Sequence, residues 1–96
     1  MNSIANKVEN VLKIIIQKYD IKSLYSDIYS YKYINEDGIK TLVIDFSDDY
    51  MSPFLAGYVS DKIYSEWEEG IANLGFEIVD TDGSTLYLEK SEAITA

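Results

Sequence analysis

The spacing of apolar side chains divides the chain into helix-like and strand-like segments. Between residues 4 and 19, apolar residues recur every three or four positions, which predicts an amphipathic helix. Residues 25–46 then alternate between apolar and polar positions on both sides of Asp37-Gly38. This dipeptide is typical of a two-residue β-hairpin turn, so the segment predicts two antiparallel strands.

The turn fixes the register that we expect for this first hairpin. A two-residue Asp37-Gly38 loop gives one wholly apolar and aromatic face, on which three tyrosines of the first strand lie opposite three residues of the second. The expected pairs are Tyr29 with Phe46, Tyr31 with Ile44, and Tyr33 with Leu42. We therefore expect these tyrosines to belong chiefly to the core.

A second helix is predicted over about 53–74. Ser52-Pro53 places a capping residue before a proline, which is favoured at the first helical position, and Gly75 is suited to the residue that follows a helix end. Gly57 and a second candidate cap, Ser60, leave the start of this helix open by one or two turns.

Residues 75–90 alternate again and predict a second hairpin. A three-residue loop, Thr81-Asp82-Gly83, places apolar residues together on one face, with Phe76 opposite Leu88 and Ile78 opposite Leu86. The other face then shows Glu77, Val79, Thr85, Tyr87 and Glu89.

These elements predict one domain over residues 1–96, in the order α-β-β-α-β-β. Ninety-six residues are too few for two separate cores. Joining the hairpins into a four-stranded antiparallel sheet, with both helices on its apolar face, gives a two-layer α+β sandwich. Residues 91–96 have no pattern, and we expect a frayed tail.

Composition restricts the chemistry. The chain has 17 Asp and Glu residues against eight lysines, a formal charge of −9, and no arginine, cysteine or histidine. Nucleophile–histidine pairs, histidine or thiolate metal sites and disulfides are thereby excluded, and the charge opposes nucleic-acid binding. We expect no enzyme activity, no cofactor and no metal. Neither a signal peptide nor a membrane span is recognisable, so we expect a cytoplasmic protein without membrane contacts.

Two acidic clusters are candidates for a binding surface. The first, from Asp45 to Asp49, carries three carboxylates; it could hold Mg²⁺ or Ca²⁺, form a solvated loop that favours the next helix N-terminus, or bind a partner. The second comprises Asp61, Glu66, Glu68 and Glu69 of the second helix. It is a solvated face, a mimic of a row of phosphates, or a surface that meets lysines of a basic protein. The predicted partner-binding residues are Asp45, Asp48, Asp49, Tyr50, Asp61, Tyr64, Glu66, Glu68 and Glu69.

In size, charge and lack of catalytic groups, the chain is similar to immunity proteins that bacteria pair with secreted nuclease toxins. The likeness covers overall character and carries over no functional residue. It implies a monomeric inhibitor that binds a basic nuclease or toxin domain in a 1:1 complex. One alternative is a phage-encoded, nucleic-acid-mimicking inhibitor of a host defence nuclease, such as an anti-CRISPR or anti-restriction protein. Another is an acidic secretion chaperone or assembly adaptor that dimerises through Ile34, Val43, Val79 and Tyr87.

Overall fold

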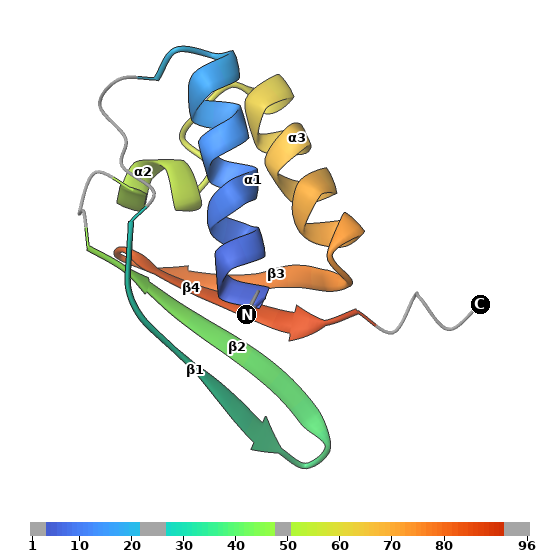
Figure 1. Cartoon of the computed structure of the whole chain (residues 1–96). Coiled ribbons are helices and arrows are strands. Elements are labelled where there is room, and N and C mark those ends of the chain that lie inside the picture. Colours follow the sequence, from blue (N-terminus) through green and yellow to red (C-terminus); the bar gives the residue numbers. More distant parts are fainter. Residues whose placement is uncertain (1–3, 22–26, 48–50, 92–96) are drawn as a thin grey trace.

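Helices and strands follow one another in the predicted order in a computed structural model, which describes residues 4–21, 27–47 and 51–91 (Figure 1). The elements are α1 (Ile4–Lys18), β1 (Ile28–Glu36), β2 (Ile39–Phe46), α2 (Met51–Leu55), α3 (Asp61–Asn73), β3 (Phe76–Asp82) and β4 (Thr85–Lys90). The α+β fold with a four-stranded antiparallel sheet is confirmed. Of the tail predicted to fray, the structure describes only Ser91.

The two hairpins join through their second strands, which gives the sheet order β1-β2-β4-β3. In the first hairpin, Tyr31 lies opposite Ile44 and Tyr33 opposite Leu42, as predicted. Asp37 and Gly38 have φ angles of 53° and 78°, the left-handed pair that a two-residue hairpin turn requires.

Both hairpins contain a bulge that was not predicted from the sequence. In β1 the register shifts between Ile28 and Ser30, so that Ile28 rather than Tyr29 lies opposite Phe46. The predicted pairing of Tyr29 is therefore wrong. A bulge adds one residue to one strand and reverses the alternation beyond it, so pattern counting fails at that point.

The predicted second register is also wrong. The turn consists of Gly83 and Ser84, because Asp82 pairs with Thr85 instead of lying in the loop. Ile78 lies opposite Leu88, and the register then shifts between Ile78 and Asp80. Val79 is an extra residue in β3 that has no partner on β4. This bulge, and not a three-residue loop, keeps the apolar residues of the two strands on the same face.

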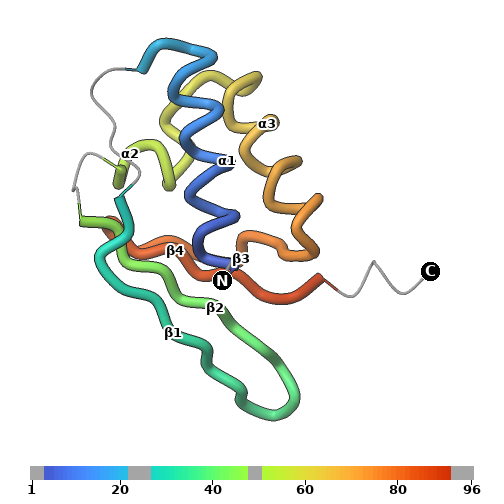
Figure 2. The backbone as a smooth tube through the Cα atoms, viewed as in Figure 1, coloured from blue at the N-terminus to red at the C-terminus, as the bar shows by residue number. Residues whose placement is uncertain are grey.

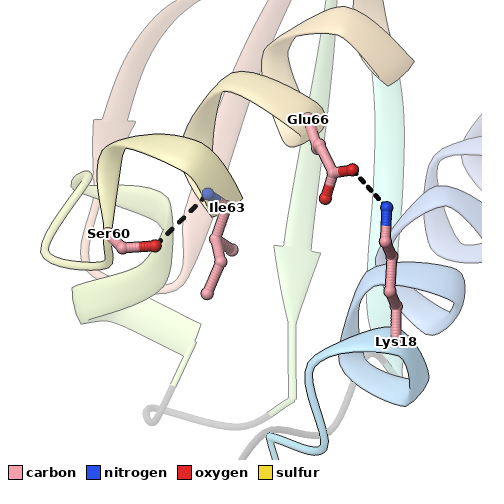
Figure 3. Close-up of polar contacts among 4 residues, drawn as sticks. All are labelled: Lys18, Ser60, Ile63 and Glu66. Atoms are coloured by element: carbon pink, nitrogen blue, oxygen red, sulfur yellow. Dashed lines mark hydrogen bonds and ion pairs between the residues drawn. The ribbon is translucent and has the colours of Figure 1, made fainter.

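The segment predicted as one helix over 53–74 is divided into α2 and α3. Gly57 has a φ of 87° and its N–H donates to the carbonyl of Phe54 at 3.0 Å, which ends α2. The second candidate cap begins α3: the Ser60 hydroxyl accepts from the N–H of Ile63 at 3.3 Å (Figure 3).

The helices lie on one side of the sheet and enclose the core (Figures 1 and 2). Trp67 of α3 is fully buried and meets Phe54 of α2 edge to face, with ring centroids 5.9 Å apart. The remaining buried core residues are Ala5, Val8, Leu12, Ile15, Leu42, Ile44, Phe46, Met51, Leu55, Ile71, Leu86 and Leu88.

The tyrosines of β1 do not belong to this core, contrary to the prediction. Tyr29, Tyr31 and Tyr33 are 79%, 47% and 56% exposed. Tyr31 and Tyr33 lie on the same face of the sheet as their buried partners Ile44 and Leu42. However, β1 is an edge strand, and its hairpin extends beyond the helices (Figure 2). The apolar face therefore continues past the layer that covers it.

Candidate protein-binding surface

The residues predicted to bind a partner are divided between two sides of the molecule. Asp45 lies on β2, whereas Asp61, Tyr64, Glu66, Glu68 and Glu69 lie on α3. Asp48, Asp49 and Tyr50 lie outside the described residues.

Asp45 faces away from the helices. Its chain neighbours Ile44 and Phe46 are in the core, so strand alternation directs the Asp45 side chain to the opposite face of the sheet. There its two carboxylate oxygens accept hydrogen bonds from Ser30 Oγ at 3.1 Å and Thr85 Oγ1 at 2.5 Å. The carboxylate thus links β1, β2 and β4 and lies apart from the acids of α3.

Glu66 connects the two long helices. Its Oε1 accepts from Nζ of Lys18 at 2.5 Å (Figure 3), and this hydrogen bond is the main cause that lowers the pKa of Glu66. The same carboxylate also interacts with the hydroxyl of Tyr19. This interaction is the main cause that raises the pKa of Tyr19, and burial adds to it. Glu66 is therefore engaged within the fold.

Tyr64 is half-buried at the junction of α2 and α3. Its hydroxyl donates to the carbonyl of Leu55 at 3.4 Å, and its ring lies 3.7 Å from where a Cβ of Gly57 would be. Burial, with a smaller contribution from the charge of Glu68, raises the pKa of Tyr64. The side chain stabilises the bend between the helices.

The other three predicted carboxylates of α3 share its solvent-facing side. Asp61, Glu68 and Glu69 are exposed. At 3.6 residues per turn, positions 61 and 68 lie about 20° apart around the helix, and position 69 lies within about 80° of position 61. The structure thus brings these three together, as a charged helix face.

A second acidic surface lies on the outer face of the sheet, which is the face away from the helices. The register places Glu89 between Thr41 and Glu77, Tyr87 between Val43 and Asp80, and Thr85 between Asp45 and Asp82. We call this surface the acidic outer face: Asp45, Glu77, Asp80, Asp82 and Glu89. Among the described lysines, strand parity places Lys32 on this side, at its β1 margin.

Apolar side chains occupy the middle of the acidic outer face. Val43 is only 5% exposed although no described helix covers it, and Lys32 and Tyr87 lie directly opposite it on the neighbouring strands. The bulge residue Val79 is 44% exposed. An apolar centre with a charged rim is the usual anatomy of a protein-binding surface.

One pair on this face is unfavourable in the isolated protein. Glu77 lies directly opposite Glu89. Like charges directly opposite each other destabilise a sheet. A cationic group of a partner placed over this pair would remove the repulsion.

Most of this face could not be predicted from strand alternation because of the Val79 bulge. Plain alternation places Glu77 and Glu89 outside, and these two were predicted there. It places Asp80 and Asp82 on the helix side, but the bulge moves both to the outer face. No residue type in this segment announces the bulge.

Comparison with known proteins adds no relatives. No protein-family model matches the chain, and neither a curated protein nor a solved structure is significantly similar to it. Within the described ranges, no three acidic side chains are grouped so as to hold a metal ion. No helix among the described residues is long and apolar enough to cross a membrane.

Proposed function

We propose that this protein is a cytoplasmic inhibitor that binds a basic protein in a 1:1 complex, and that the acidic outer face is the contact surface. The basic protein is a nuclease or toxin domain, and the inhibitor is its immunity protein. The observation that carries this proposal is five carboxylates surrounding an apolar strip on a sheet face that no described helix covers.

Two physical effects support this proposal. A chain with a charge of −9 attracts a cationic partner over long range and raises the association rate. Val79 and the partly buried Tyr87 then provide apolar area whose burial slows dissociation. The five carboxylates lie on three hydrogen-bonded strands, whose backbone is already ordered in the free protein. Little backbone entropy is therefore lost when the carboxylates bind cationic groups of a partner.

The test compares two variants with the same change of charge. E77Q/D80N/D82N neutralises three carboxylates of the acidic outer face, whereas D61N/E68Q/E69Q neutralises three on the solvent side of α3. All six side chains are exposed. Each immobilised variant and the wild-type protein are used to capture binding proteins from an extract of the source cells.

The proposal predicts that the wild-type protein and the α3 variant retain the same basic protein, and that the outer-face variant loses it. The purified partner should show nuclease activity that one equivalent of wild-type protein abolishes. Equal capture by both variants contradicts the proposed contact surface. A partner whose activity is unaffected contradicts inhibition.

A second candidate function rests on a different strand. β1 is an edge strand of nine residues with three exposed tyrosines, and an exposed apolar edge is a template for pairing with another strand. This favours an acidic chaperone or adaptor that dimerises or holds a client through β1. Light scattering distinguishes the candidates, because a dimer of the isolated protein favours the adaptor and a monomer favours the inhibitor.

A further inference from the structure

A groove opens on the helix side of the sheet. It lies between the first turn of α1, the end of α3, the start of β3, the end of β4 and the part of the first hairpin that adjoins its turn. Its volume is about 580 Å³, within the range of roughly 300–1,000 Å³ that is typical of small-molecule sites. Figure 1 shows α1 beginning above the sheet close to the end of β4. Apolar side chains form much of the lining: Ile4, Tyr33, Ile34, Leu74 and Phe76.

The charged groups that line this groove are Lys40 and Lys90, and its described lining contains no carboxylate. Lys40 lies opposite Asn35 and Lys90 opposite Phe76. Because Thr41 pairs with Glu89, the two lysines occupy neighbouring positions on β2 and β4. The groove is therefore lined by two lysines that come from opposite positions on neighbouring strands.

Strand alternation produces this separation of charge. Glu89 and Glu77 project to the outer face. Lys90 follows Glu89 along β4, and Lys40 precedes its partner Thr41 along β2, so both lysines project to the helix side. Lys13 and Lys18 form ion pairs with glutamates. Neither Lys40 nor Lys90 forms an ion pair with a described carboxylate.

We propose that the groove binds a small amphiphilic carboxylate. The carboxylate group lies between the ammonium groups of Lys40 and Lys90, and the apolar body covers Leu74 and Phe76. The net negative charge of the protein does not prevent this, since at physiological ionic strength charges farther away than about 8 Å are largely screened. This proposal stands independently of the inhibitor function, which uses the opposite face of the sheet.

Octanoate is the probe, and binding is followed by amide chemical shifts of the full chain in a two-dimensional NMR titration. Octanol provides the same apolar body without charge, and acetate provides the charge without the body. We expect saturable shifts with octanoate that are largest around Leu74, Phe76 and Lys90. We expect binding of octanol and acetate at least about fivefold weaker, because each ligand lacks one half of the match.

Two charge-matched variants locate the site. K40Q/K90Q should weaken octanoate binding about fivefold to tenfold, since each exposed ion pair contributes modestly. K32Q/K62Q removes two lysines that do not line the groove and should leave the affinity unchanged. All four lysines are exposed, so both variants are expected to fold. Spectra of the unliganded variants that match the wild-type spectrum would verify this.

The proposal is overturned by the absence of saturable shifts, by octanol binding as tight as octanoate binding, or by equal weakening in the two variants. Shifts confined to the outer face of the sheet would also overturn it, because they would place the ligand elsewhere.

Discussion

Replacing Gly70 with alanine tests how α1 packs against α3. A Cβ at Gly70 would lie 2.5 Å from Cγ1 of Val11, well inside the contact distance of about 3.5–4.0 Å between carbon atoms. Valine in a helix has one strongly preferred rotamer, so rotation of its side chain offers little relief. The helices must therefore move apart, or Val11 must adopt an unfavourable rotamer.

The expected magnitude is the difference between two opposing effects. Alanine is favoured over glycine inside a helix by about 1 kcal/mol. Overpacking a contact of this kind costs about 1–3 kcal/mol. We therefore expect G70A to lower the free energy of unfolding by about 1 kcal/mol, whereas an unobstructed glycine replaced by alanine would raise it by the same amount.

A double-mutant cycle isolates the contact. V11A removes the obstructing methyl groups, so in that background G70A should stabilise the protein by about 1 kcal/mol, which gives a coupling energy of about 2 kcal/mol. Urea unfolding followed by circular dichroism measures all four proteins. Comparison of S65G with S65A, at an exposed position of α3, gives the intrinsic glycine-to-alanine difference in this helix. If G70A stabilises both backgrounds by that intrinsic difference, the close approach of the helices is refuted.

Three further predictions concern the helix link, the helix start and the first turn. The Lys18 hydrogen bond lowers the pKa of Glu66, so its stabilising contribution is present above the ordinary glutamate pKa and is lost as pH falls through the lowered one. Urea unfolding at a series of pH values should show a smaller loss of stability toward acid in E66Q than in wild type, and equal losses would contradict the link. S60A removes the acceptor for the Ile63 N–H and should cost about 1 kcal/mol in urea unfolding, whereas S60D should retain most of the stability. G38A meets no atom within 4 Å, but its φ of 78° is unfavourable for alanine, so thermal unfolding should show a loss of about 1–2 kcal/mol that G38N largely avoids.

The fold could be predicted from the sequence where one local rule decides the structure. Asp37-Gly38 fixed the first turn and the pairs Tyr31–Ile44 and Tyr33–Leu42, because a two-residue turn leaves one register. The spacing of apolar residues identified the buried faces of the helices, including Trp67 and Ile71. Ser60 was recognised as a possible helix start, but only the path of the chain through Gly57 decides between it and Ser52-Pro53.

The missed features depend on tertiary structure. The bulge at Val79 adds a residue to β3 while Ile78 and Thr81 keep their side chains on the helix side, opposite Leu88 and Leu86. It thereby moves Asp80 and Asp82 to the outer face. Tyr31 and Tyr33 of β1 are exposed because the first hairpin extends beyond the helices, and helix placement over a sheet is not encoded in the strand's own alternation. The candidate site was therefore predicted in its charge and only partly in its position.

The salt dependence of the association rate tests the central claim most directly. The captured basic partner is mixed by stopped flow with wild type, with E77Q/D80N/D82N and with D61N/E68Q/E69Q over a range of ionic strengths. Both variants lose the same charge, so the account predicts that the outer-face variant associates markedly more slowly and with a flatter salt dependence than the α3 variant. Equal rates for the two variants, or a larger loss in the α3 variant, would contradict it.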